Sequence, residues 1–500
     1  MIADHIAPLF VAIPLAGAFL VAVAGPGSRR LPEWAAGVCT LSALLLVAPA
    51  WLQVRAGGTV VYAAGGWAPP LGISFVLDGL SVFVLLTINL VAFVVALYAP
   101  AYIARFTGRW IFQALFLLMV AGMNGVAATG DLFNLFVFLE IASVASYALV
   151  AFGTERQELE AAFKYAIMGS VASLFILLGI ALIYSRAATL NMADLARTLE
   201  GRREDHTSAL VAVLFLTGFG LKAALAPFHA WLPDAHPSAP APISAMLSGV
   251  LIKALGIYAN ARIFFNVLGN LDATLPVLRA LGAISMVAGV LLAVGQWDFK
   301  RLLAYHSISQ VGYIVLGIGL GTPLGLLGGL FHLLNHALFK SLLFLDAGAV
   351  AYATGTRDLR RLGGLSQRMP FTSATTLTAS LSISGIPPFN GFWSKLIIIV
   401  AAVEAGYYSY AVWAVIASIL TLASFMKVMK YGFLGPLNPE LAEVREVPWT
   451  MRAPMVLLAA LCALGGLLLL DGPREMLLEP AVSALAQGLA YADTALMEGK

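Results

Sequence analysis

The 500-residue sequence is 60% hydrophobic and only 11% charged, with a formal net charge of +3. Soluble domains carry about a quarter of their residues as charges, so this composition excludes an ordinary soluble protein. The few positive charges are spread through short segments, which excludes a basic tract for nucleic acid. The cysteines, Cys39 and Cys462, both lie inside apolar runs. We therefore expect no disulfide framework, no metal cluster and no cofactor.

Apolar runs long enough to cross a membrane follow one another along almost the whole chain. A spanning helix needs about 20 such residues. Because lipid leaves no partner for free backbone groups, long runs without alternation predict helices rather than a barrel. The sequence thus predicts an all-α integral membrane protein of about fourteen spans, the first retained because no cleavage signal precedes it. The runs lie near 7–25, 33–52, 76–100, 110–129, 131–152, 161–185, 208–226, 239–267, 274–296, 302–320, 323–350, 371–403, 407–433 and 453–470.

Positive charges gather in the loops that follow odd-numbered spans, which predicts that these loops face the cytoplasm. The loop 186–208 departs from this pattern, but its Arg197, Arg202 and Arg203 are mixed with acids. Both termini are then expected outside the cytoplasm of a bacterial inner membrane, with the tail after Pro473 along the membrane surface. The residues that set this orientation are Arg29, Arg30, Arg105, Arg109, Lys300, Arg301, Arg357, Arg360, Arg361 and Arg368.

Two spans contain helix-breaking residues. Residues 221–242 carry five prolines, and residues 382–395 carry Pro387 and Pro388 between two glycines. Proline removes a backbone donor and clashes with the preceding turn, so both spans are expected to be broken. The breaks echo one another in a Pro-Phe pair followed closely by a tryptophan. Paired broken helices in transporters accompany internal repeats with an ion site at each break.

Four charged residues fall well inside the apolar runs: Glu140, Lys222, Lys253 and Lys395. A charge at the centre of a spanning helix costs about 2.5–3.5 kcal/mol on insertion scales, so such residues usually serve transport. The alternatives are a static Glu140–Lys222 ion pair and lysines whose ammonium groups snorkel to the interface. We favour proton translocation.

His332, His336 and Lys340 follow one another at intervals of four residues in the eleventh span. This spacing lines one helix face, with about 6 Å between successive residues. Histidine changes charge near neutrality, so the stripe suits stepwise proton transfer; the alternatives are core histidines bonded to carbonyls and a Lys340 that reaches the interface. Further candidates for the proton path are Lys164, His229, Asp234 and His236. We interpret Asp78 as an N-cap at the membrane surface.

Several stretches around these residues resemble the antiporter-like subunits of the complex I superfamily, in order, from about residue 60 to residue 435. The sequence looks closest to the D-type subunit of Mrp cation/proton antiporters and is also similar to the antiporter-like subunits of membrane-bound hydrogenases. The stretches are GDLFNLFVFLE, TLNMADLA, PFHAWLPDAHPSAP, QWDFKRLLAYHSISQVGYI, HLLNHALFK and SGIPPFNGFWSK.

This resemblance implies fourteen helices, with the seventh and twelfth broken, and two inverted five-helix repeats over 106–270 and 271–435, flanked by N-terminal helices (1–105) and a C-terminal helix and tail (436–500). It implies that the Glu140–Lys222 pair gates one half-channel. Lys253, His332 and His336 would connect the halves, and Lys395 would face the other side. The implied partners are a homologous antiporter-like subunit and small hydrophobic subunits.

Two other function classes remain as alternatives. A haem-binding redox subunit would need axial ligands on opposite sides of one iron, which histidines four apart on one helix do not provide. A solitary carrier for an organic solute fits poorly with several buried lysines and few acids. Within the favoured class, a sodium/proton antiporter, a membrane-bound hydrogenase and a complex I type dehydrogenase all stay open as the parent complex.

Overall fold

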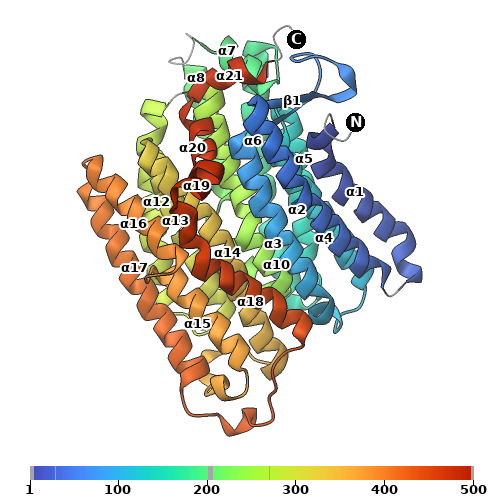
Figure 1. The fold of residues 1–500 in the computed structure, drawn as a ribbon, viewed down its shortest axis with the longest axis vertical. Helices are drawn as coiled ribbons and strands as arrows, with labels where there is room; N and C mark the ends of the chain where they lie inside the picture. Colours follow the sequence, from blue (N-terminus) through green and yellow to red (C-terminus); the bar gives the residue numbers. More distant parts are fainter. Residues whose placement is uncertain (1–4, 29, 201–205, 270, 497–500) are drawn as a thin grey trace.

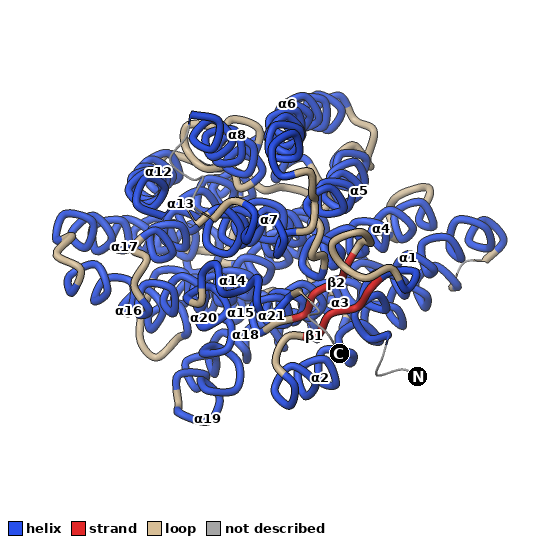
Figure 2. The backbone as a smooth tube through the Cα atoms, turned by 90° about the horizontal axis from the view of Figure 1, so that it is seen from above, coloured by secondary structure: helices blue, strands red, loops and turns tan. Residues whose placement is uncertain are grey.

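The computed structural model describes residues 5–28, 30–200, 206–269 and 271–496. It is a bundle of long helices beside a small two-stranded antiparallel sheet (Figure 1). Viewed down the bundle, α1 lies at one end of an elongated cross-section and α16 and α17 at the other (Figure 2). Arg29, Arg202 and Arg203, three of the loop arginines that bear on orientation, lie outside the described residues.

The first half of the chain contains the sheet, the first break and the helices on both sides of that break. The strands are β1 (Val60–Ala63) and β2 (Ser74–Leu77). The helices are α1 (Ile6–Ala24), α2 (Leu31–Gly57), α3 (Gly79–Ile103), α4 (Arg109–Ala128), α5 (Leu132–Val150), α6 (Arg156–Ala187), α7 (Met192–Thr198), α8 (His206–Lys222), α9 (Leu232–Ser238), α10 (Ala241–Met246) and α11 (Ala259–Arg262).

The second half is helical throughout its described elements. Its helices are α12 (Leu271–Val294), α13 (Phe299–Gly319), α14 (Pro323–Thr354), α15 (Pro370–Ser384), α16 (Asn390–Glu404), α17 (Tyr408–Val428), α18 (Trp449–Leu464), α19 (Asp471–Pro473), α20 (Glu479–Ala486) and α21 (Tyr491–Ala495).

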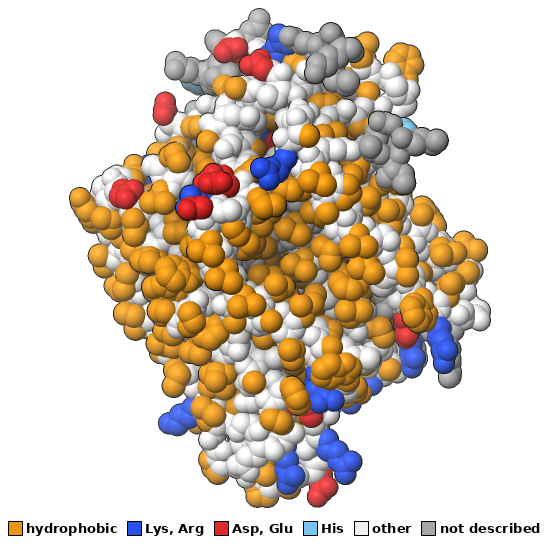
Figure 3. All heavy atoms as spheres, viewed as in Figure 1, with side chains coloured by type: hydrophobic (Ala, Val, Ile, Leu, Met, Phe, Trp, Pro, Cys, Tyr) orange, Lys and Arg blue, Asp and Glu red, His pale blue; other side chains and the backbone are white. Residues whose placement is uncertain are grey.

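Twelve described helical stretches are long and apolar enough to cross a membrane. The two remaining predicted spans are the broken ones: α8 stops at Lys222 after 17 residues, and α15 and α16 have 15 residues each on either side of the second break. The sequence prediction of an all-α membrane protein is therefore confirmed. A broad apolar belt separates charged groups at the two ends of the molecule (Figure 3).

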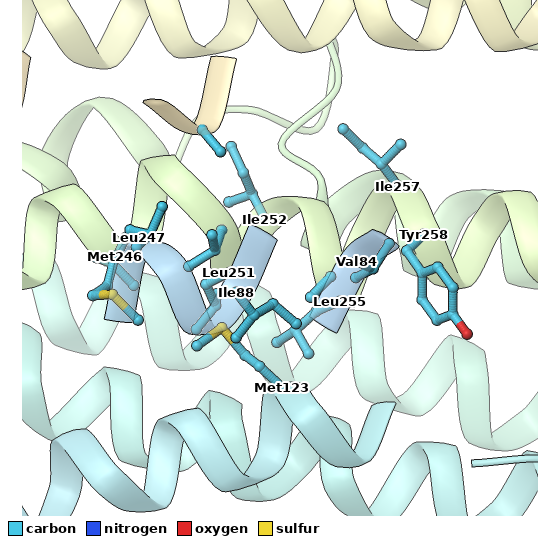
Figure 4. Close-up of a cluster of buried hydrophobic side chains, with 14 of the residues drawn as sticks. Val84, Ile88, Met123, Met246, Leu247, Leu251, Ile252, Leu255, Ile257 and Tyr258 are labelled. Carbon is cyan, nitrogen blue, oxygen red and sulfur yellow. The ribbon is translucent and has the colours of Figure 1, made fainter. Parts of the chain in front are cut away.

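The centre of the bundle is the stretch Ala241–Leu268, whose apolar window is buried throughout. Its apolar side chains pack against Val84 and Ile88 of α3 and Met123 of α4 (Figure 4). Three π-helical segments, Leu247–Leu251, Lys253–Tyr258 and Ile263–Leu268, interrupt its α-helical pattern. Such π segments are rare and are found mostly at functional sites.

The sequence analysis expected the C-terminal tail to lie along the membrane surface. In the structure the tail packs against the bundle instead. Helix α20 runs beside α3 and α14 towards the end that holds α7 and α21 (Figure 1). Leu478, Ala481 and Leu485 are fully buried in this contact. The tail has an apolar face. Burying this face against the helices is more favourable in free energy than leaving it exposed to lipid headgroups.

A buried ion pair fastens the tail. Asp78 caps α3 by accepting from the Ser81 backbone at 2.8 Å, as predicted, and its Oδ1 also lies 2.7 Å from the Arg262 guanidinium. The Arg262 guanidinium carbon sits 5.1 Å from the ring centre of Tyr491 in the tail. Asn266 donates to the carbonyls of Ala484 and Gly488, both at 2.9 Å. Asp78 is therefore buried beneath the tail rather than placed at the surface.

The two broken helices share one backbone pattern. At the first break the Leu225 amide donates to the Gly220 carbonyl at 3.0 Å, and at the second the Ile386 amide donates to the Leu381 carbonyl at 3.0 Å. The preceding residue has a positive φ in both, 54° at Ala224 and 77° at Gly385. Both helices therefore end in the same left-handed turn. The donor residues of the two turns are 161 residues apart in the sequence, and so are the acceptor residues.

A second backbone pattern also occurs twice, offset by 167 residues. Asp131 and Asn191 form an isolated antiparallel bridge, and so do Asp298 and Asp358. Asp131 caps α5 and Asp298 caps α13, while Asn191 and Asp358 each cap the short helix that follows them. The first bridge lies beside the start of α7, and the second joins the start of α13 to the loop between α14 and α15, at the opposite end of the bundle (Figure 1).

Glycine at 391 allows α15 and α16 to meet closely at the second break. A Cβ at Gly391 would lie 1.9 Å from the Ser382 carbonyl oxygen, so Gly391→Ala must displace one helix. We expect a loss of about 1–3 kcal/mol of stability, as for overpacked cores, measured as a lower thermal unfolding midpoint of the purified complex. Gly37→Ala in α2 is the control, because its Cβ meets nothing within 4 Å. An unchanged midpoint for Gly391→Ala would contradict this close packing.

Candidate functional site

Glu140 and Lys222, 82 residues apart in sequence, meet in the membrane interior. The Lys222 ammonium lies 3.4 Å from Glu140 Oε1 and donates to the Ser143 hydroxyl at 2.9 Å. Ser173 of α6 also donates to Glu140 Oε1. Lys222 is the last residue of α8, where the free carbonyls of a helix end favour a cation. The break thus leaves an ammonium at the end of a half-helix, beside its acid.

The two partners of this ion pair differ in exposure. The Lys222 side chain is 4% exposed and that of Glu140 is 32% exposed. Phe133, Val137 and Val144 are exposed on the same helix, α5. A charged side chain facing lipid is costly, so this partly open acid suits a position covered by another protein chain.

Lys253 lies in the π-helical part of the central stretch and is 2% exposed. Its ammonium donates to the Ser248 carbonyl, inside the bundle. The neighbouring Gly256 lets this stretch touch the first break, because a Cβ there would lie 2.5 Å from the Ala223 backbone. Lys253 therefore does not snorkel to an interface.

His332, His336 and Lys340 form the predicted stripe on α14, and all three are fully buried. The rings of His332 and His336 are 6.4 Å apart and nearly parallel. His332 is held on both sides, by Ser394 at 2.9 Å and Gln310 at 3.2 Å, whereas neither ring nitrogen of His336 has a hydrogen-bond partner among the described residues. The ammonium of Lys340 donates to the Leu303 carbonyl rather than reaching an interface.

Lys395 lies at the second break, five residues after α16 begins. Its ammonium donates to the Ile383 carbonyl at 2.8 Å, in the last turn of α15, and lies 4.6 Å from the ring centre of Tyr313. The side chain is 2% exposed, and Lys395 lines a cavity of about 200 Å³ with Ser384, Gly385 and Ser418. Its ammonium therefore sits at the carbonyl end of a half-helix, as that of Lys222 does.

A polar cavity of about 290 Å³ opens at the end of the molecule that carries the arginine loops. It is lined by Lys164, Asp234, Asp298, Arg301 and Arg357, among others. Asp234 pairs with Lys164 at 3.1 Å and with Arg301 at 3.4 Å. Two residues further along α9, His236 is fully buried, and neither of its ring nitrogens has a described partner.

Among the groups near this end, His229 and Asp358 do not line the polar cavity. His229 stays a candidate for the proton path. The side-chain hydrogen bonds from Arg360 hold the pKa of the nearby Asp358 carboxyl below its ordinary range. Asp358 therefore stays charged at neutral pH and is unsuited to carry protons there.

The sequence prediction of the site missed several buried ionisable residues. Lys300 was treated as a loop charge, but it is 2% exposed and donates to the Ala239 carbonyl. His306 of α13 is fully buried and bonds the Ser424 hydroxyl at 2.9 Å. Asp346 of α14 is also fully buried. His306 and Asp346 both lie inside predicted spans, so the cost of a charge at membrane depth was a signal that could have found them.

Known proteins share both the sequence and the fold. Residues 129–421, more than half of the chain, match the model of the NADH:quinone oxidoreductase/Mrp antiporter transmembrane family. The chain belongs to this family. The NADH-quinone oxidoreductase subunit N of Desulforudis audaxviator is 40% identical over 416 residues, covering 81% of this chain and 80% of that protein. The D-type subunit of the Na(+)/H(+) antiporter of Alkalihalophilus pseudofirmus is 37% identical over 402 residues, covering 80% and 81%.

The family fold extends over almost the whole chain. A chain in the structure of the Mrp complex from Dietzia sp. DQ12-45-1b superimposes with a TM-score of 0.90 at 32% identity, covering 99% of this chain and 100% of that one. The matched stretch of the family model contains Glu140, Lys222, Lys253, His332, His336 and Lys395.

Proposed function

We propose that this chain is the proton-translocating subunit of a multi-subunit cation/proton antiporter of the Mrp type. The observation that carries the proposal is the set of ionisable groups inside the bundle, which the proposal orders as a row: Lys222 beside the partly exposed Glu140, then the buried Lys253, His332–His336 pair and Lys395. Each lysine ammonium is held by a carboxylate, a hydroxyl or a carbonyl inside the protein. Such groups at membrane depth are characteristic of proton relays.

The two halves of the family region act, in this proposal, as inverted repeats over 106–270 and 271–435. Support comes from the two backbone patterns that recur with offsets of 161 and 167 residues, and from the opposite ends at which the two bridges lie. An inverted pair of broken helices places one ion site in each half. Lys222 and Lys395 would be those two sites.

The proton moves along this row in steps. Glu140 stabilises the Lys222 ammonium; when a charge on a neighbouring protein chain pulls Glu140 away, the buried ammonium loses that stabilisation and releases its proton towards Lys253. The proton then passes His336 and His332 and reaches Lys395, which discharges it on the other side of the membrane. The polar cavity at Asp234, with Lys164 and the buried His236, supplies the entry side, and Lys340 extends the stripe towards it.

The end of the molecule with the arginine loops faces the cytoplasm in this proposal. Arg105 stacks on Tyr352 and Arg357 pairs with Asp298, so the loops after the third, ninth and eleventh predicted spans meet at one end. Helix α1 begins and α21 ends at the opposite end (Figure 1). The positive-inside rule then places both termini outside the cytoplasm of a bacterial cell membrane.

The chain is an ion-transport subunit without a redox centre of its own, working beside a homologous antiporter-like subunit and small hydrophobic subunits. Identities of 40% and 37% do not separate the dehydrogenase and antiporter branches, so a proton-pumping subunit of a dehydrogenase or hydrogenase is the alternative. Co-purification from native membranes discriminates between them. Small hydrophobic partners indicate the antiporter, iron–sulfur partners indicate the alternative, and a chain that purifies alone contradicts both.

Replacing Glu140 by glutamine tests the relay. Glu140→Gln keeps the shape but removes the charge that holds Lys222, so we expect cation-dependent proton transport to fall on the order of 100-fold. Transport is measured in inverted membrane vesicles by quenching of a pH-sensitive acridine dye, with assembly checked by affinity purification. Glu404→Gln, at the exposed end of α16, is the matched control and should transport normally. Normal transport by an assembled Glu140→Gln complex would refute the gating pair.

A further inference from the structure

A group of polar side chains, called the polar seam below, follows the face of α14 that packs against α15, α16 and α18. The proposed relay does not use it. The seam consists of Glu446, Thr372, Thr375, Asp346, Ser382, Asn390 and Ser394. Its centre is Asp346, which is fully buried. Asp346 Oδ1 accepts from the Thr375 hydroxyl at 2.8 Å, while Oδ2 has no hydrogen-bond partner among the described residues. No described lysine, arginine or histidine forms an ion pair with it. An unpaired buried carboxylate costs several kcal/mol unless it binds a cation.

The outer part of the seam connects Asp346 to the surface at the end with the arginine loops. Thr372 lies one turn before Thr375 on α15, and its hydroxyl donates to Glu446 Oε1 at 2.7 Å. Glu446 is partly exposed and also caps α15 by accepting from the Phe371 backbone at 2.9 Å. The two threonines are about 4.5 Å apart along the helix axis, a gap that one water molecule can bridge.

The inner part of the seam leads from Asp346 towards His332. Ser382 lies seven residues beyond Thr375 on α15, so both hydroxyls are on one helix face, about 10 Å apart along the axis. Ser382 donates to the side chain of Asn390, which in turn donates to Asn335 at 2.9 Å. One turn beyond Asn390, the Ser394 hydroxyl bonds His332 at 2.9 Å. The side-chain amides of Asn390 and Asn335 hold the Ser382 hydroxyl in place. The seam reaches the relay where Ser394 bonds His332.

We propose that Asp346 is a proton-binding residue on a second access route, which runs from Glu446 along the α15 hydroxyls to Asp346 and on to His332. A proton arriving from the Glu446 side forms an O–H bond at Oδ2, and its departure towards Ser394 and His332 restores the carboxylate. The other titratable groups around Asp346 are Tyr98 of α3, Cys462 and Glu446. The proposal rests on the proposed transport function and adds a route to it.

The competing role for Asp346 is purely structural, tying α14 to α15 through Thr375. Asp346→Asn separates the two roles, because an asparagine oxygen still accepts the Thr375 hydrogen bond but binds no proton. In the whole complex we expect Asp346→Asn to assemble normally and to transport protons on the order of tenfold more slowly, with partial recovery in Asp346→Glu. Thr375→Val should also slow transport, whereas the isosteric control Thr421→Val should not, because the Thr421 hydroxyl bonds only its own helix at Ala417.

Infrared difference spectra between acid and alkaline buffer supply a readout independent of transport. We expect a protonated carboxyl band that is absent in Asp346→Asn and shifted in Thr375→Val. Unchanged transport in Asp346→Asn, or a carboxyl band that persists unchanged in that variant, overturns the route. If Asp346→Asn does not assemble, a missing shift in Thr375→Val overturns it instead. Loss of transport in Glu140→Gln alongside normal transport in Asp346→Asn rejects this route while leaving the main relay intact.

Discussion

Lys395→Met is expected to abolish cation-dependent proton transport without destabilising the complex. The Lys395 ammonium is buried with a carbonyl and an aromatic ring as its partners, and no described carboxylate pairs with it. Methionine has a similar length and fills the same space, so the substitution removes the last proton carrier together with a buried charge. Desolvation of a single buried ion costs several kcal/mol, so replacing this unpaired ammonium by an apolar side chain of similar size is expected to leave stability unchanged or to raise it. Transport should fall to the background of the vesicles.

The direction of the change in stability separates a role in proton transfer from a structural role for Lys395. Transport is measured by dye quenching in vesicles, and stability by the thermal unfolding midpoint of the purified complex. Lys430→Met, at an exposed position in the stretch Met429–Leu434 after α17, is the matched control and should behave as the wild type in both assays. A lower midpoint in Lys395→Met would assign the lysine a structural role, and residual transport at the wild-type rate would remove it from the relay.

Arg262→Met is expected to cause the largest loss of stability among single substitutions of ion pairs. It leaves Asp78 buried without its cation, removes the hydrogen bond to Asn266 at 3.1 Å, and takes away the contact with Tyr491 that fastens the tail. Breaking one side of a buried pair costs about 3–5 kcal/mol. The midpoint of thermal unfolding should drop, and limited proteolysis should cut the tail after Pro473 sooner than in the wild type.

Two comparisons separate this effect from a general loss of positive charge. Arg474→Met breaks the exposed pairs with Asp471 and Glu479, which contribute little to stability because water and salt screen them. The double variant Asp78→Asn, Arg262→Gln removes both buried charges and should recover part of the stability lost in Arg262→Met. A tail equally resistant to protease in Arg262→Met and the wild type would show that the pair does not hold it.

The local sequence predicted the helices and both breaks because these depend on nearest neighbours. Long apolar runs must form helices in lipid, and Pro227 and Pro388 interrupt them wherever the rest of the chain lies. The cap at Asp78 and the stripe of His332, His336 and Lys340 follow from spacing along one helix in the same way. The direction of the tail did not follow, because its weakly apolar face could cover either headgroups or helices.

Charge at membrane depth marked Glu140, Lys222, Lys253 and Lys395 as unusual from the sequence itself, since the cost of burying an ion depends on composition and depth. What those ions touch was decided by tertiary structure alone. Helix packing brings Glu140 within 3.4 Å of Lys222 across 82 residues, and Lys395 against the carbonyl of Ile383. It also removes Lys300 from the surface and leaves Asp346 without a counter-ion among the described residues. A hydrogen bond is formed over about 3 Å, a distance that is fixed only once the helices have packed.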